Sequence, residues 1–240
     1  MVEPGVMKVQ YHRFCLAVTI IACISMMEAR WGPSKVYAAN NRGDQVTVPQ
    51  SALNSLIGEP NRHFHRAADL YIEGDTDGAA NEIRAAGALI RIEAGRGSVE
   101  DSAKLKAVAT ALDTLADNVA DGNVASRRDL DLAFAHADLA LAAHYRSMAN
   151  IALADKDHAG AGRWLKAAGD SVDEATAWTG RTPSGAQAEA WDQMHALQAK
   201  IRTSANWSYD EARKGVGYLG TQIQYLGQQM QNLSTRNNQH

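Results

Sequence analysis

The chain has 240 residues, of which 24 are basic and 27 acidic, so its formal net charge at neutral pH is −3. No segment gathers lysines and arginines into a basic stripe, and this excludes nucleic acids and anionic membranes as expected partners. Both cysteines, Cys15 and Cys23, lie near the start of the chain. If that part is removed, disulfides, thiol nucleophiles and cysteine-zinc sites are excluded as well.

Residues 1–39 have the layout of a secretory signal peptide. A short basic start precedes an almost wholly apolar run at 14–27, and residues 36–38 (Val-Tyr-Ala) have the small-x-small pattern of a cleavage site. The apolar run is too short to cross a bilayer as a helix, which takes about 20 residues. A lipoprotein signal ending at Cys23 and an uncleaved anchor are the alternatives. We therefore expect an exported protein, periplasmic or secreted, with no membrane span in the mature chain.

Beyond the signal peptide we expect a polar linker (40–50), a single all-helical domain (51–234) and a disordered polar tail (235–240). Alanine is abundant and no run alternates strictly at period two, which is typical of helices rather than strands. In chain order the pattern predicts a short helix near 53–57, helices over about 60–73, 77–94, 98–121, 126–154 and 158–178, and a long last helix from about 182.

The helix predicted over 126–154 carries apolar residues on two faces. Phe134, Leu141 and Tyr145 follow one stripe, whereas Leu132 and Leu139 lie roughly opposite. A helix that is apolar on two faces is buried on two sides, so this helix should be central in the fold.

Residues 63–90 and 144–172 look like two copies of one helix-turn-helix unit. His63-Phe64 matches His144-Tyr145 at an offset of 81, and residues 84–87 match 166–169 at an offset of 82, after one residue inserted in the turn. Repeated hairpins bury their apolar faces against neighbouring repeats. The expected fold class is therefore all-α: a bundle or array of antiparallel helix hairpins, with an internal duplication and a long C-terminal helix.

The second copy resembles a tetratricopeptide-type helix hairpin. The small and large packing positions of that repeat are matched by Met148, Ala149, Ala152, Ala161, Leu165 and Ala168. The first copy agrees at Ala68, Tyr71 and Ala80 but lies one residue early at Ile83 and Ala86. The copies are about 81 residues apart, whereas that repeat runs in tandem at about 34. The resemblance implies a protein-binding or scaffolding surface and no catalytic residue.

Apolar residues in the last helix alternate at spacings of four and three, as in the seam of a coiled coil. One interpretation is a long helix packed against the chain's own hairpins. The other is an interface with a protein partner or a second copy of the chain, formed by Val216, Leu219, Ile223, Leu226 and Met230.

Four histidines are candidate ligands of a transition metal, because histidines that converge inside a helical bundle can bind zinc, copper or iron. His63 and His144 hold equivalent positions in the two copies, His65 follows His63 by two residues, and His136 lies two turns before His144. The alternative for each is a solvated or hydrogen-bonded side chain without a ligand role.

The motifs that resemble enzyme or cofactor sites lack the surrounding sequence that such sites need. Asp192-x-x-His195 resembles half of a di-iron pattern that a bundle needs twice. The glycines of residues 215–220 have dinucleotide-binding spacing but follow no strand. We therefore expect a non-enzymatic binding, scaffolding or structural protein of the periplasm or cell envelope. The alternatives are a metal-binding histidine bundle and an enzyme of unrecognised type.

Overall fold

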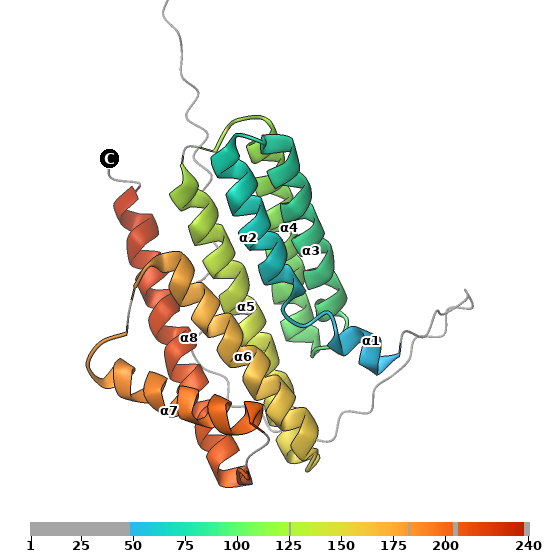
Figure 1. The fold of residues 1–240 in the computed structure, drawn as a ribbon, viewed down its shortest axis with the longest axis vertical. Helices are drawn as coiled ribbons and strands as arrows, with labels where there is room; N and C mark the ends of the chain where they lie inside the picture. Colours follow the sequence, from blue (N-terminus) through green and yellow to red (C-terminus); the bar gives the residue numbers. More distant parts are fainter. Residues whose placement is uncertain (1–48, 125, 182, 204–205, 238–240) are drawn as a thin grey trace, which may run out of the picture. The chain divides into compact units, whose positions relative to one another are not determined.

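The computed structural model describes residues 49–124, 126–181, 183–203 and 206–237. Within them the chain forms eight helices and no strand, so the all-α prediction is confirmed (Figure 1). The helices are α1 (Gln50–Asn54), α2 (Glu59–Glu73), α3 (Thr76–Ala94), α4 (Val99–Ala120), α5 (Arg127–Ala154), α6 (His158–Thr179), α7 (Ala186–Arg202) and α8 (Tyr209–Asn237). The expected signal peptide, nearly all of the linker and the last residues of the tail lie outside the described residues.

The first half of the described chain is a run of long helices that pack in order, with α3 lying between α2 and α4. Gly74 ends α2 with a positive φ of 84°, and the carboxylate of Asp75 then caps α3 by accepting from the Gly78 amide. Ser98 caps α4 in the same manner through the amide of Asp101. Side-chain caps of this kind satisfy amides that a helix start otherwise leaves open, and they fix where each helix begins.

The central position predicted for the helix over 126–154 is confirmed. α5 packs against α6, α8, α4 and α2, and it therefore joins the first half of the bundle to the second (Figure 1). Phe134, Leu141 and Tyr145 on one stripe are at most 1% exposed, and Leu139 on the opposite side is 7% exposed. Burial on both sides explains why this helix has little polar surface.

The chain from 182 onward is two helices, not one. α7 and α8 pack against each other and both contact α6; α7 ends at Arg202 and α8 begins at Tyr209. Ser208 and Glu211 form a reciprocal capping box at the break: the Glu211 amide donates to Ser208 Oγ (3.1 Å), and the Ser208 amide donates to Glu211 Oε2 (2.8 Å). The prediction of a long C-terminal helix is correct for α8, which has 29 residues, but it placed the start too early.

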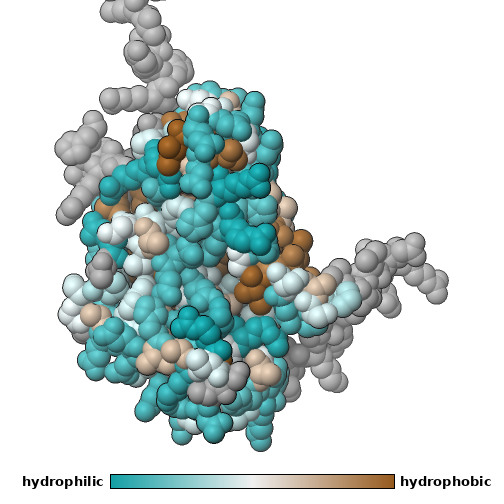
Figure 2. Space-filling view, in the orientation of Figure 1, coloured by the Kyte–Doolittle hydropathy of each residue, from teal (hydrophilic) through white to brown (hydrophobic). Residues whose placement is uncertain are grey.

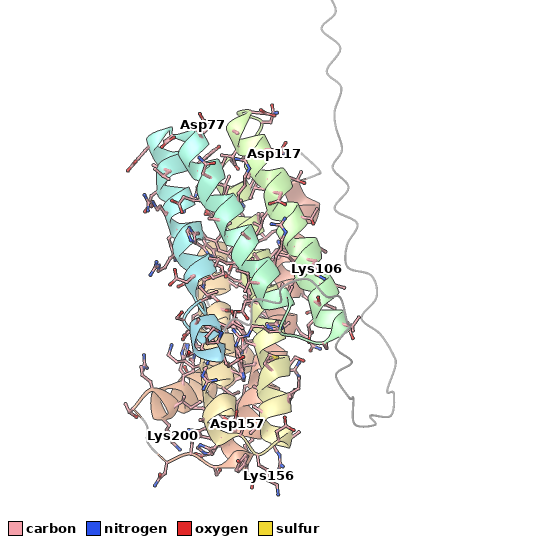
Figure 3. The ribbon with its side chains drawn as sticks, turned by 90° about the vertical axis from the view of Figure 1, so that its right-hand side faces the viewer. Asp77, Lys106, Asp117, Lys156, Asp157 and Lys200 are labelled. Carbon is pink, nitrogen blue, oxygen red and sulfur yellow. The ribbon has the colours of Figure 1, made fainter. Side chains whose placement is uncertain are left out.

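The turns of the two proposed repeat copies have the same local structure. Asp157 caps α6 by accepting from the Gly160 amide, as Asp75 does for α3, and Lys156 has a positive φ of 59° where the first copy has Gly74. The two turns lie at opposite ends of the bundle, marked by Asp77 and Asp157 in Figure 3. This likeness is in keeping with a duplication, which stays an interpretation.

Most of the visible surface is hydrophilic. Figure 2 shows hydrophobic residues gathered toward one end of this face and along the flank where α3 and α1 lie. The large apolar side chains with the most exposure are Ile72, Ile92, Val99 and Ile151. None of the described helices is both long and apolar enough to cross a membrane.

Candidate functional site: a buried polar centre

The two histidines at equivalent repeat positions contact the same helix at different heights. His63 Nδ1 lies 2.5 Å from Glu82 Oε2, whereas His144 Nε2 lies 3.6 Å from Glu93 Oε2. The two glutamates are 11 residues apart on α3, which corresponds to about 16 Å along an α-helix. His63 and His144 therefore do not share a partner that could bring them to one metal ion.

The other two candidate ligands have separate partners again. His65 Nε2 pairs with Glu174 Oε2 (2.8 Å), and its ring lies against Trp178. His136 Nδ1 pairs with the backbone oxygen of Leu132 (2.7 Å). The described part of the chain contains no group of three or more histidine, cysteine, aspartate or glutamate side chains placed to hold a metal ion. The geometry thus gives the histidine-metal hypothesis no support.

The proposed interface residues of the last helix lie in the chain's own core. Leu219, Leu226 and Met230 are at most 1% exposed, Val216 is 6% exposed, and Ile223 packs partly buried against the same cluster. α8 buries this seam against α5, α6 and α7. The first of the two interpretations, a helix packed on its own hairpins, therefore describes this seam.

Four polar side chains meet inside the bundle where α3 ends beside α5. We call Glu93, Arg96, His144 and Tyr145 the polar centre. Glu93, His144 and Tyr145 are each 1% exposed, and the Arg96 side chain is 6% exposed. Charged side chains are almost never buried to this degree unless they are paired. Their partners therefore determine what this centre does.

Arg96 connects three helices through its guanidinium. Nη1 donates to Glu93 Oε1 (2.9 Å) and to the Leu53 backbone oxygen (3.1 Å), and Nη2 donates to Asn54 Oδ1 (2.8 Å). The guanidinium also lies over the Trp164 ring, 4.7 Å from its centroid. A buried ion pair repays its desolvation only when further hydrogen bonds satisfy both ions. The bonds to Leu53 and Asn54 satisfy part of the guanidinium and hold α1, which has no buried residue of its own.

Several other atoms of the polar centre have no hydrogen-bond partner among the described residues. They are Glu93 Oε2, Arg96 Nε, both ring nitrogens of His144 and the Tyr145 hydroxyl. The 3.6 Å between His144 Nε2 and Glu93 Oε2 exceeds a hydrogen-bond distance. On the other edge of the imidazole the backbone comes close, because a Cβ on Gly97 would lie 2.8 Å from His144 Cε1.

Tyr145 remains a hydrogen-bond donor in this environment. Burial raises the pKa of its hydroxyl, and the nearby Glu93 carboxylate raises that pKa further, against an opposing effect of Arg96. Its ring stacks on Trp164 with 5.8 Å between centroids. The protonated hydroxyl is therefore fixed in place by the aromatic contact while its proton lacks an acceptor.

A second buried acid, Asp138, lies on α5 two turns before Tyr145. Asp138 is fully buried, and its Oδ2 accepts from Trp178 Nε1 (3.0 Å), whereas Oδ1 has no partner among the described residues. Burial raises the pKa of this carboxyl well above its ordinary value, and Glu174 raises it further, while the Trp178 hydrogen bond opposes both. The Asp138 carboxyl therefore takes up a proton at a higher pH than an exposed aspartate does.

An open hollow of about 450 Å³ lies at the other end of α6, between the start of that helix and the segment that precedes α8. His158 stacks on Trp207 at 3.5 Å, and its Nε2 lies 3.1 Å from the Trp207 backbone oxygen. Gly162 permits this packing, since a Cβ there would lie 3.0 Å from the indole. These contacts explain how the break between α7 and α8 is held against α6.

Comparison of the chain with models of protein families, with curated proteins and with solved structures finds no match.

The sequence contained an overlooked signal for the polar centre. Glu93 continues the core stripe of Ile83, Ala86 and Ile90 at spacings of three and four, so it lies on the buried face of α3. From the sequence alone we did not consider Glu93, and we weighed His144 as a metal ligand or as a solvated or hydrogen-bonded side chain. The same reasoning applies to Asp138, which continues the buried stripe of α5 four residues after Phe134.

Proposed function

We propose that this protein is a non-enzymatic binding or scaffolding protein that acts outside the cytoplasm, in the periplasm or cell envelope. One observation carries the proposal: the groups with unusual chemistry are sealed in the core. His144, Tyr145 and Asp138 are at most 1% exposed, so no substrate reaches them in this fold. Their contacts instead join α5 to α3 and α6, which is a structural task.

The outer face of α3 supports a binding role. Ile83 and Ile90 face the core, whereas Ala88, Leu89 and Ile92 lie on the opposite side of the helix, where Ile92 is 44% exposed. This outer side also carries exposed Arg84 and Arg91, and among the described helices α3 packs chiefly on α2 and α4. Exposed apolar faces mark contact surfaces, so we assign this face to a protein partner of different sequence that presents an apolar helix.

Site-specific photo-crosslinking in the source organism tests the binding role. A photoreactive residue at Ile92 should give a crosslink to one defined partner, and the same residue at Lys106, which is exposed on α4 (Figure 3), should not. The purified partner should then bind the mature chain, and Ile92→Arg should abolish that binding. Identical crosslinks at both positions, or a crosslink only to a second copy of this chain, would contradict the proposal.

Export is tested by the mass and N-terminal sequence of the protein recovered from cells. Cleavage after Ala38 or Ala39 should give a mature chain that begins at Ala39 or Asn40. A lipid-modified chain that begins at Cys23 would establish the lipoprotein alternative. Retention of residues 1–39 on a cytoplasmic protein would refute export.

A further inference from the structure

The polar centre concentrates hydrogen-bonding atoms that lack partners in a region from which solvent is excluded. Such atoms are rare in folded proteins, and burying one without a partner destabilises the fold. Here they belong to all four side chains of the centre: Glu93, Arg96, His144 and Tyr145. A concentration of this kind indicates a bound molecule that completes the hydrogen bonds.

Four of the five unpaired atoms match the bonding capacity of one water molecule, and the fifth, His144 Nδ1, lies beside the Gly97 backbone. The Tyr145 hydroxyl and Arg96 Nε–H are donors, and Glu93 Oε2 is an acceptor. His144 Nε2, which faces Glu93 Oε2, is an acceptor when the imidazole carries its proton on Nδ1. A water molecule accepts two hydrogen bonds and donates two, and buried waters in proteins typically make about three.

The charges favour a neutral molecule over an ion. Glu93 and Arg96 already neutralise each other at 2.9 Å. The aromatic wall of Trp164 and the Gly97 backbone beside the imidazole confine the space. A small neutral molecule that can both donate and accept therefore fits the centre best.

We propose that the polar centre binds an ordered water molecule that joins Glu93 Oε2, His144 and the Tyr145 hydroxyl beneath α1. Arg96 contributes through two parts of its guanidinium: its Nη atoms hold α1, and its buried Nε–H has no partner among the described residues. The water thereby extends the link between α3 and α1 to α5.

A crystal structure of the mature chain at about 1.5 Å resolution tests the proposal directly. We expect one density peak within about 3.2 Å of at least two of Glu93 Oε2, the His144 ring nitrogens and the Tyr145 hydroxyl oxygen. Direct hydrogen bonds among these side chains, with no peak between them, would overturn the proposal. A peak with the distances and anomalous signal of a metal ion would overturn it as well.

A variant and a solution measurement complete the test. Tyr145→Phe removes one of the donors and should weaken or displace the peak. Tyr71→Phe, which loses a hydroxyl that donates to the Val124 backbone, should leave it unchanged. In solution, the Gly97 amide should show a cross-relaxation signal to a long-lived water. If Tyr145→Phe does not fold, the wild-type crystal structure and the signal at the Gly97 amide still test the site. If the density peak and this signal are both absent, the proposal is refuted.

Discussion

Removing Arg96 should destabilise the fold far more than removing a surface arginine. In Arg96→Met the Glu93 carboxylate stays 1% exposed but loses its counter-ion, and the oxygens of Leu53 and Asn54 lose their donor. Breaking a buried pair by removing one partner costs about 3–5 kcal/mol. Domains of this kind are stable by only about 5–15 kcal/mol. The variant should thus lose about a fifth or more of its folding free energy.

The double variant Glu93→Leu with Arg96→Met separates charge burial from packing. Replacing both ions by apolar side chains of similar volume is often neutral or stabilising. The double variant should therefore recover roughly 2–3 kcal/mol of the unfolding free energy lost in Arg96→Met. It should stay less stable than wild type, because α1 still loses its hydrogen bonds to Arg96. Arg84→Met is the control: Arg84 pairs with Asp117 at 2.8 Å on the surface of the same hairpin, and its loss should cost under about 1 kcal/mol.

Urea unfolding of the mature chain, followed by circular dichroism, measures these differences. With a urea dependence of about 3 kcal/mol per M, Arg96→Met should lower the midpoint by about 1–2 M. The reasoning is refuted if Arg96→Met and Arg84→Met shift the midpoint equally, or if the double variant is no more stable than Arg96→Met.

Two further predictions use the same assay. Gly97→Ala should cost about 1–3 kcal/mol, because its Cβ would lie 2.8 Å from His144 Cε1. Gly217→Ala should stabilise the fold by up to about 1 kcal/mol, because Gly217 lies on the exposed side of α8 and an added Cβ would meet nothing within 4 Å. Equal effects of the two substitutions on stability would contradict the close approach of Gly97 to His144. The stability of Asp138→Asn relative to that of wild type should increase as the pH rises. The raised pKa of Asp138 means that the wild-type fold is favoured below the ordinary value of 3.8 and loses that advantage as the pH rises through the folded-state pKa. A gain that is the same at pH 4 and pH 7, or one matched by exposed Asp121→Asn, would refute this prediction.

The helices could be predicted where local chemistry decides them. Gly74 and Asp75 mark the end of α2 and the start of α3, and the two apolar faces of α5 required a central position. The break between α7 and α8 was missed because the apolar spacing continues across it. The pair of Ser208 and Glu211 was the local signal that the helix starts again.

The polar centre could be predicted only in part. The position of Glu93 in the apolar repeat of α3 shows that it faces the core. No pattern in the sequence, however, predicts that this part of α3 lies beside His144 on α5. Their meeting depends on how the helices pack. The same holds for Arg96, which follows the end of α3 and would be solvated without α1 and Trp164. Tertiary contacts, and not the local pattern, determine these partners.

The place of the polar centre suggests what it contributes beyond stability. The halves of the bundle meet chiefly where α5 packs on α4 and α2, and small apolar residues such as Ala135 and Ala142 are abundant on α5. Small apolar contacts tolerate sliding of one helix along another, whereas the buried polar atoms of Glu93, His144 and Tyr145 come together in one register. We infer that the centre helps to set the register of α5 against the first half of the bundle, as buried polar groups do in coiled coils. The Glu93→Leu, Arg96→Met double variant distinguishes this role from simple stabilisation. It should unfold with a broader urea transition than wild type, and an equally sharp transition would refute the inference.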